Sequence, residues 1–294
     1  MTLDISSPKN AYDIILRERP WLVVNTAAYT AVDRAESESE LASRINEDAP
    51  GQMAKACQET GAILIHVSTD YVFDGSASKS YRETGLVQPL NVYGASKLKG
   101  ETLVRAACER HIILRTSWLF ASHGNNFVRT MLRLALERDT ISIVDDQLGI
   151  PTDARSLAFA IIKMAERLAN GNNGAFGIFH AVGGPRASWF EFAEAIFNCA
   201  RQYSHPVPRL QPISSERYPT PALRPRFSVL DCSALEREWN ISVPSWKADL
   251  DSTVQSIIHD LGGGTNEGHC FGRGRRHAPP SSYASDFQAI IARL

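Results

Sequence analysis

The chain has 294 residues, of which 44% are hydrophobic and 21% are charged, and these values are ordinary for a globular protein with a sizeable core. Its 31 basic and 32 acidic residues give a net charge of −1, which excludes the basic surface that binds nucleic acid or an anionic membrane. No apolar run approaches the roughly 20 residues of a membrane helix, and residues 1–5 do not resemble a signal peptide.

The expected elements of the first half alternate between strands and helices. In chain order they are a strand at 21–24, a helix at 40–59 closed by Gly61, a strand at 63–67, a helix at 93–108, a strand at 111–115, a helix at 126–137 and a strand at 141–144. Such alternation predicts right-handed crossovers and a parallel sheet covered on both faces. We therefore expect a doubly wound α/β domain over residues 1–145.

The composition changes after this domain. Prolines punctuate shorter helical pieces, such as the one expected at 189–199, and we predict a smaller, loop-rich lobe over residues 146–261. This lobe would lie over the edge of the sheet and bind substrate. Residues 262–294 begin with three glycines and are rich in Gly, His, Arg, Pro and Ser. Such a segment buries little apolar surface, so we expect a flexible tail there.

The number and spacing of the cysteines indicate the redox state of the compartment in which the protein works. Cys57, Cys108, Cys199, Cys232 and Cys270 are an odd, scattered set without a Cys-x-x-Cys pair. This pattern fits a reducing environment and fits neither a disulfide framework nor a zinc site. We expect a cytoplasmic protein.

The chemistry is indicated by Tyr93 and Lys97, which are four residues apart in an expected helix. Residues at this spacing share a helix face, so the phenol and the ammonium can point into one pocket. Upstream, the apolar run 63–67 leads into Thr69 and Asp70, and open α/β sheets build their sites at such carboxyl ends of strands. A nearby ammonium would lower the pKa of a tyrosine from its usual ~10 and suit it to exchange a proton during hydride transfer. A lone Tyr-x-x-x-Lys also arises by chance in many helices. The main support for a catalytic pair is therefore its position after the strand that ends at Thr69 and Asp70.

Seven ordered blocks of the sequence resemble a known family. They are residues 25–33, 68–75, 89–94, 115–118, 124–127, 146–152 and 218–225. From about Leu3 to about Leu261 the chain resembles the extended short-chain dehydrogenases and, more narrowly, the dTDP-4-dehydrorhamnose reductase family. The resemblance implies a Rossmann-like fold. It also implies the reduction of dTDP-4-dehydro-6-deoxy-L-mannose to dTDP-L-rhamnose by NADPH or NADH, a step in the synthesis of cell-surface polysaccharide.

The resemblance also implies roles for individual residues. Tyr93 would donate the proton, and Lys97 would lower the pKa of Tyr93 and bind the nicotinamide ribose. Thr69 would hydrogen-bond the 4-keto oxygen, with Asp70 and Trp118 beside the sugar. The other positions that would border the cofactor are Asp4, Ile5, Ala27, Ala28, Tyr29, Thr30 and Val67.

Several of these positions also have a plain structural interpretation. Trp118 could be a core aromatic that follows a strand, and Ala27 and Ala28 could serve tight packing. Arg224 and Arg226 could meet the diphosphate through their guanidinium forks, or they could simply face solvent.

The chain departs from the family at its start. The family opens with a strand, a Gly-x-x-Gly-x-x-Gly turn and a helix whose N-terminus holds the pyrophosphate, whereas no glycine precedes Gly51 here. We therefore expect that the first βαβ unit is absent and hypothesise that Met1 is a mis-set or secondary start. Translation of the upstream DNA tests the hypothesis, and an immediate in-frame stop without a glycine-rich turn would eliminate it. Residues 265–294 also lack resemblance to the family.

Some relatives carry a dimer-associated Mg²⁺ held by carboxylates. Here Asp153 and Ala154 are followed by Arg155, where a glutamate is common, so we expect no metal. The expected partners are a dTDP-sugar and, as an open alternative, a second copy of the chain. The sequence does not distinguish NADPH from NADH.

Three functions stay open. Thr69, Tyr93 and Lys97 favour an active nucleotide-sugar reductase. The missing phosphate-binding turn favours a catalytically impaired remnant or a regulatory binding protein on the same scaffold. A nucleotide-sugar epimerase or dehydratase would share the tyrosine and lysine, but residues 69–73 and 218–225 favour the reductase.

Overall fold

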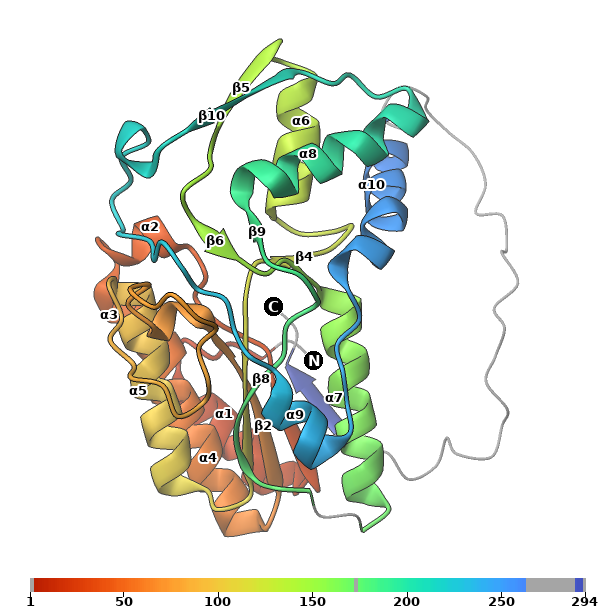
Figure 1. Ribbon diagram of the computed structural model, residues 1–294. Coiled ribbons are helices and arrows are strands. Elements are labelled where there is room, and N and C mark those ends of the chain that lie inside the picture. Colours follow the sequence, from red (N-terminus) through yellow and green to blue (C-terminus); the bar gives the residue numbers. More distant parts are fainter. Residues whose placement is uncertain (1–2, 172–173, 263–288, 293–294) are drawn as a thin grey trace.

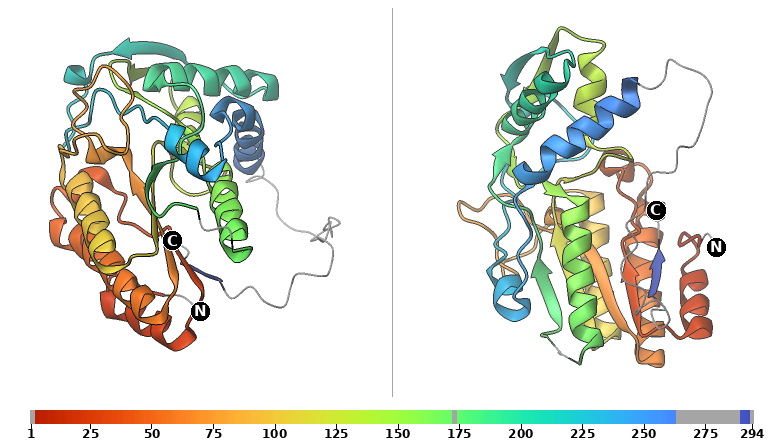
Figure 2. Two further views of the ribbon diagram at one scale, coloured as in Figure 1. Left: turned by 60° about the horizontal axis from the view of Figure 1, so that its bottom comes forward. Right: turned by 90° about the vertical axis from the view of Figure 1, so that its right-hand side faces the viewer.

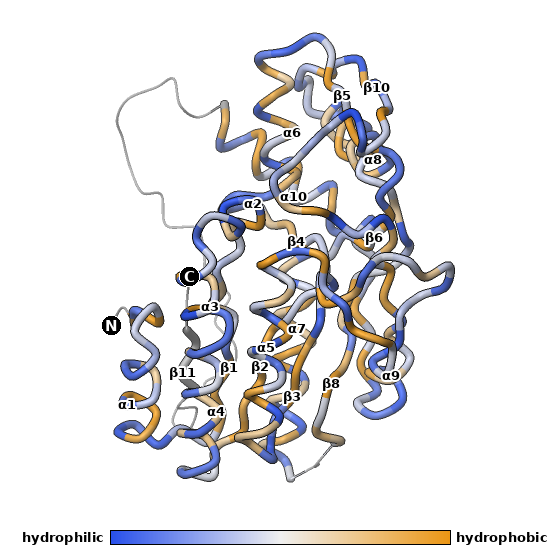
Figure 3. The backbone as a smooth tube through the Cα atoms, turned by 90° about the vertical axis from the view of Figure 1, so that its left-hand side faces the viewer, coloured by the Kyte–Doolittle hydropathy of each residue, from blue (hydrophilic) through white to orange (hydrophobic). Residues whose placement is uncertain are grey.

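The computed structural model describes residues 3–171, 174–262 and 289–292 of the chain (Figure 1). Its main sheet has five strands in the order β11–β1–β2–β3–β8, and every neighbouring pair is parallel. Figure 3 shows the strands in this order. They are β1 (Leu22–Asn25), β2 (Ile63–Thr69), β3 (His111–Thr116), β8 (Gly177–His180) and β11 (Ala289–Ala292).

Helices cover both faces of this sheet. On one face lie α1 (Pro8–Glu18), α4 (Ala49–Thr60) and α5 (Val92–Ala107), and on the other lie α7 (Ala154–Ala169) and α9 (Ser233–Trp239). Successive side chains of a strand point to opposite faces. In β1, for example, Val23 packs in the first layer, whereas Leu22 and Val24 pack in the second. The predicted doubly wound α/β fold is confirmed.

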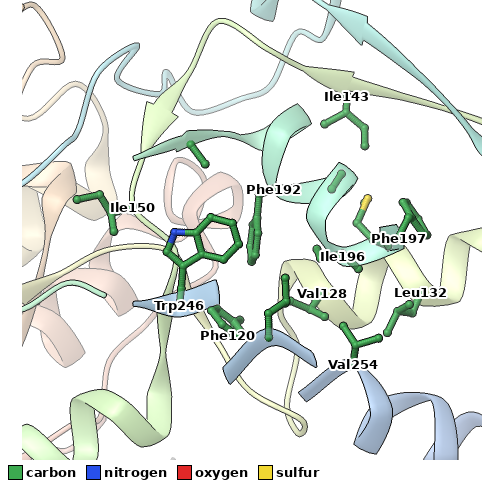
Figure 4. Close-up of a cluster of buried hydrophobic side chains, with 14 of the residues drawn as sticks. Phe120, Val128, Leu132, Ile143, Ile150, Phe192, Ile196, Phe197, Trp246 and Val254 are labelled. Atoms are coloured by element: carbon green, nitrogen blue, oxygen red, sulfur yellow. The ribbon is translucent and has the colours of Figure 1, made fainter. Parts of the chain in front are cut away.

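A second core lies in a smaller lobe, at the top of Figure 1. It is built from α6 (Phe127–Ala135), α8 (Trp189–Ala200) and α10 (Trp246–Gly262), with β5 (Thr140–Val144) and β10 (Arg209–Ile213) beside them. Figure 2 shows this lobe from two further sides. In the close-up of its core, side chains from the three helices meet at Phe192 and Trp246 (Figure 4). The remaining elements are α2 (Val32–Ala35), β4 (Leu119–Phe120), β6 (Leu148–Gly149), β7 (Thr152–Asp153), β9 (Ala187–Ser188) and three 3₁₀ turns at Asp70–Val72, Arg201–Tyr203 and Ser215–Arg217.

Local signals set the ends of the helices. The Asn91 side chain accepts a hydrogen bond from the Gly94 amide and starts α5, and Ser188 with Glu191 forms a capping box at the start of α8. Such caps satisfy amides that have no partner within the helix. Helix α4 ends at Gly61, in the left-handed conformation that suits glycine.

The helix expected at 40–59 is confirmed as a continuous helical stretch made of α3 (Ser39–Ser43), a π-helical turn (Arg44–Asp48) and α4. One expectation about the elements was wrong. The strand expected at 141–144 is β5, but it pairs with β10 outside the main sheet. Only alternate residues of β5 are buried, whereas all four residues of β1 are. A strand covered on one face does not fit a sheet that is covered on both. Helix α1 had not been anticipated.

The predicted boundary between residues 145 and 146 stays a prediction. Within the second predicted range, β8 joins the main sheet, and α7 and α9 cover it. The chain thus passes between the two packing units more than once. Most of the predicted tail lies outside the described residues, and the part that is described forms β11 beside β1. Among the helices described, none combines the length and the apolar character that a membrane span needs.

A tight helix contact yields a stability test. A Cβ atom at Gly100 of α5 would lie 2.0 Å from the carbonyl oxygen of Asn46 in the π-helical turn. We expect Gly100→Ala to lower the free energy of unfolding by about 1–3 kcal/mol, because backbone must move to admit the methyl group. Denaturant unfolding measures this, with Arg105→Ala on the exposed side of the same helix as the control. Equal midpoints for the two variants would contradict the close contact.

Candidate active site

Tyr93 and Thr69 meet where the carboxyl end of β2 faces the first turn of α5. Their side chains lie close enough for Thr69 to lower the pKa of Tyr93. Thr69 Oγ1 also donates to Asp70 Oδ1 at 3.1 Å and accepts the Tyr71 amide at 3.2 Å. Thr69 and Asp70 are buried, whereas Tyr93 is half-buried. Three residues predicted from the sequence are therefore brought together as expected.

The close approach of α5 depends on Gly94. A Cβ atom at this position would lie 2.2 Å from the carbonyl oxygen of Tyr71, so only glycine lets the helix start this close to the turn after β2. The rings of Tyr71 and Tyr93 then pack edge to face, with centroids 5.7 Å apart. This contact holds the Tyr93 phenol over the end of the strand.

The predicted acidification of Tyr93 by Lys97 is not found in the structure. Burial raises the pKa of Tyr93 to about 12, while the nearby Thr69 hydroxyl opposes the rise and the charge of Asp70 adds to it. Lys97 points to β2 instead, and its Nζ donates to the carbonyl oxygen of Val67 at 2.7 Å. Burial lowers the pKa of Lys97 to about 8, although Glu101 favours its charged form.

The carboxyl group of Asp70 has a raised pKa because it is buried. Burial raises its pKa to about 7, against the hydrogen bonds from Ser228 and Thr69 that lower it. Its Oδ2 atom is buried without a hydrogen-bond partner. Such an atom carries an unmet desolvation cost and is a natural contact for a polar ligand.

The segment after β1 is held by a residue that sequence reasoning missed. The Tyr29 amide donates to Asn46 Oδ1 at 2.8 Å, and Asn46 Nδ2 donates to the Tyr29 carbonyl at 3.0 Å and to Ser96 Oγ at 3.0 Å. Asn46 lies in the π-helical turn, and such turns are frequent at functional sites. No local pattern in the sequence marks the turn.

The other positions predicted to border the cofactor differ in exposure. Ala27 is buried, Ala28 and Val67 are half-buried, and Thr30 is exposed. Asp4 is exposed and accepts the Ser6 amide at 2.9 Å, whereas Ile5 is buried with α1 and α4. Their place beside a cofactor stays a prediction.

Trp118 connects the sheet to the smaller lobe. It follows β3 with a φ of +46°, a conformation that is uncommon for a bulky residue and is found at functional sites. Its ring stacks on Trp189 of α8, with centroids 3.5 Å apart and planes 6° apart. A Cβ atom at Gly149 would lie 2.5 Å from the Trp118 ring. Trp118 is therefore only half-buried, but its ring is held in place by Trp189 and Gly149.

The arginines suggested for the diphosphate have partners within the chain. Arg224 Nη2 lies 2.7 Å from Asp33 Oδ2, and this contact holds the pKa of Asp33 below its usual range. Arg226 is exposed, with its guanidinium 3.4 Å from Glu216. Arg224 thus ties residues 218–225 to the segment after β1.

The structure also describes Asp153 and Arg155, where the sequence was expected to hold no metal. Arg155 lies 3.3 Å from the Asp153 carboxylate and donates to Ser252 and Thr253. Within the described part of the chain, no three or more His, Cys, Asp or Glu side chains are grouped to hold a metal ion. The four cysteines described there are free thiols.

A buried charge network behind the site was also missed. Arg115 donates to Glu101 through Nε at 3.0 Å and Nη2 at 2.7 Å, and Ser68 Oγ donates to Glu101 Oε1 at 2.6 Å. On β2, His66 Nε2 lies 3.4 Å from Lys97 Nζ. The signal was present in the sequence, because His66 and Arg115 interrupt apolar runs that a sheet buries.

Comparisons with known proteins agree with this geometry. The family model described as the RmlD substrate binding domain matches residues 1–258. The dTDP-4-dehydrorhamnose reductase of Salmonella typhimurium is 42% identical over 257 residues, which cover 87% of this chain and 86% of that protein. The reductase of Escherichia coli K12 is 41% identical over 257 residues, with the same two coverages.

Solved structures give the same result. A dTDP-4-dehydrorhamnose reductase from Clostridium acetobutylicum has a TM-score of 0.79 at 35% identity, covering 87% of this chain and 88% of that one. The reductase of Bacillus anthracis in complex with NADP has a TM-score of 0.76 at 36% identity, covering 88% and 87%. A dTDP-glucose 4,6-dehydratase from Streptomyces venezuelae reaches 0.71 at 19% identity, covering 88% and 79%, which shows a shared fold alone.

The raised pKa of Asp70 predicts a pH-dependent stability. Its folded-state pKa of about 7 lies above the value near ~3.9 of an unfolded chain. Its stabilising contribution is therefore complete below the unfolded pKa and is lost as the pH rises through about 7. We expect Asp70→Asn to match the parent protein near pH ~4 and to exceed it above pH ~7 by about 4 kcal/mol in the free energy of unfolding.

Denaturant unfolding across this pH range measures the difference between variant and parent. Asp231→Asn is the control of opposite sign, because hydrogen bonds from Ser233 lower the pKa of Asp231. A difference between Asp70→Asn and its parent that stays constant with pH would contradict the buried, protonated carboxyl group.

Proposed function

Because the chain belongs to the dTDP-4-dehydrorhamnose reductase family, we propose that it reduces dTDP-4-dehydro-6-deoxy-L-mannose to dTDP-L-rhamnose with NADPH or NADH. The observation that carries this proposal is the meeting of Thr69 and Tyr93 at the sheet edge, with Lys97 buried one helical turn along. A catalytically impaired remnant would have no need to keep these three side chains together.

The residues at this edge fit the nicotinamide end of the cofactor. Lys97 carries donors that suit a ribose diol, and the unpartnered Oδ2 atom of Asp70 shows a polar site whose contacts are incomplete. The Tyr29 backbone is fixed by Asn46 beside them. When bound, the nicotinamide supplies the hydride. The residues of this chain orient the reactants and move the proton.

Tyr93 is suited to act as the acid in this direction of the reaction. A phenol with a pKa of about 12 is protonated at neutral pH, so it holds the proton that the sugar oxygen needs. That oxygen becomes strongly basic as hydride reaches its carbon, and it takes the proton from the phenol. The Thr69 hydroxyl, which donates to Asp70 in the structure, would then turn to the phenolate and stabilise it, because hydrogen bonds to the charged form favour that form.

The sugar would lie between the sheet edge and the smaller lobe. Asp70 would face it from the turn that follows β2, and the stacked rings of Trp118 and Trp189 would form an apolar wall from the other side. The ion pair of Arg224 with Asp33 would hold residues 218–225 over the site. These contacts support Asp70 and Trp118 as substrate-binding residues.

The assembly and location of the protein are also proposals. We place it in the cytoplasm, which its nucleotide-sugar chemistry and the free thiols among its described cysteines support. A homodimer is proposed from the family resemblance alone. Arg155 in place of a common glutamate supports a protein without the dimer-associated Mg²⁺.

Tyr93→Phe tests the proposed function directly. The loss of absorbance of the reduced nicotinamide is followed with the 4-keto sugar nucleotide and NADPH or NADH. We expect turnover to fall by at least ~100-fold, because general acid catalysis contributes 10²–10⁴-fold. Substrate binding measured by calorimetry should change little.

The matched control is Tyr12→Phe. Tyr12 donates to the exposed Glu59 at 2.9 Å, on the helical layer away from the site, so this variant should turn over like the parent protein. Undiminished turnover in Tyr93→Phe would refute the role of Tyr93. A parent protein that binds neither cofactor nor substrate would favour the regulatory scaffold.

A further inference from the structure

Lys97 is buried against a histidine whose ring is itself fixed. His66 on β2 is fully buried and Lys97 on α5 is 2% exposed. His66 Nε2 lies 3.4 Å from Lys97 Nζ, and His66 Nδ1 lies 3.0 Å from Asn25 Nδ2 at the end of β1. The three side chains form a row across two neighbouring strands and the helix above them.

The hydrogen bonds of Asn25 determine which nitrogen of His66 carries the hydrogen. Asn25 Oδ1 accepts the Ala27 amide at 3.1 Å, which identifies Nδ2 as the atom that faces the ring. An amide nitrogen can only donate, so His66 Nδ1 must accept. Burial and the charge of Lys97 both lower the pKa of His66, so the ring is neutral and its hydrogen is on Nε2.

This tautomer points an N–H group at Lys97. An ammonium has three donors and no lone pair, so it gains nothing from a second donor and is repelled by its positive end. A neutral amine has a lone pair and can accept the bond. The N–H group of His66 therefore favours the neutral amine of Lys97 over its ammonium form.

We propose that Asn25 and His66 are positioning residues that stabilise the neutral amine of Lys97 and so offset the preference of Glu101 for the ammonium. The proposal deepens the proposed function and rests on it for its role in the reaction. With the two influences opposed, Lys97 can exchange a proton near neutral pH. The Asn25–His66 pair thereby determines the pH range over which the Lys97 ammonium can interact with the Tyr93 phenol and the ribose.

The other charged and titratable groups around Lys97 are accounted for by element. On α5 itself the group is Glu101, and on β2 it is His66, beside the Val67 carbonyl that accepts from Lys97 Nζ. Arg115 on β3 binds both carboxylate oxygens of Glu101 and weakens the pull of that carboxylate on Lys97. Among these groups, His66 is the one that faces Nζ with a fixed donor.

Nuclear magnetic resonance tests the proposal without any need for turnover. In protein labelled with ¹⁵N-histidine, His66 should show Nδ1 without hydrogen and Nε2 with hydrogen. In protein labelled with ¹³C-lysine, the Lys97 side chain is titrated in the parent and in His66→Gln, whose amide oxygen can turn to the ammonium. We expect the Lys97 midpoint to rise by about one pH unit in the variant.

The control is His111→Gln on the neighbouring strand. His111 Nδ1 contacts the Cys108 carbonyl at 2.6 Å, so this change should leave the Lys97 midpoint in place. If His66→Gln does not fold, Asn25→Ala replaces it. That variant frees Nδ1 to carry the hydrogen and leaves Nε2 as an acceptor, so the midpoint should again rise.

Two results would overturn the proposal. One is a His66 spectrum with the hydrogen on Nδ1 or on both nitrogens at neutral pH. The other is a Lys97 midpoint that is unchanged or lower in the folded variant. Failure of the proposed function is distinguishable, because it would appear as absent turnover in a parent protein whose Lys97 and His66 spectra are as expected.

Discussion

The buried ion pair of Glu101 with Arg115 ties α5 to the sheet, and the geometry of the whole site depends on it. Both side chains are 2% exposed, so their desolvation is costly unless every donor and acceptor is well placed. The two guanidinium contacts, the Ser68 hydroxyl and the face of Phe73 under the Arg115 guanidinium offset much of that cost. Removing either charge would leave the other alone in the core. The pair therefore fixes the register of α5, and with it the reach of Lys97 one turn earlier.

The same helix also couples the sheet to the smaller lobe. Asn91, which caps α5, donates to the carbonyl oxygen of Leu223 at 2.7 Å. The amide of Val92 donates to Glu36 at 2.9 Å, so two loops converge on the first turn that carries Tyr93. Arg224 completes the connection through Asp33. These contacts place the Tyr93 phenol, the proposed proton donor, at the boundary of the two packing units.

Much of this site could be predicted because its members lie in short, local patterns. The strand that ends at Thr69 and the helix that carries Tyr93 and Lys97 follow from apolar runs and helical spacing, and their meeting follows from the topology of a parallel sheet. Asn46 could not be predicted, because a π-helical turn has no distinct composition. The exclusion of β5 from the main sheet depends on which tertiary partner covers its second face. Likewise, the partners of His66 and Glu101 are set by long-range packing that no window of sequence contains.

Burial, rather than a neighbouring charge, controls the protonation of the site. From spacing alone, the lysine was expected to make the tyrosine acidic. In the structure, both Tyr93 and Lys97 shift toward their neutral forms, because each loses water and neither has a full counter-charge in contact. For a reduction this is the useful direction, since a tyrosine that had already lost its proton could not supply one to the sugar oxygen. In the proposed reaction the ammonium would be needed only after the proton has left, when the phenolate appears, and a lysine with a lowered pKa could respond to that charge as it forms.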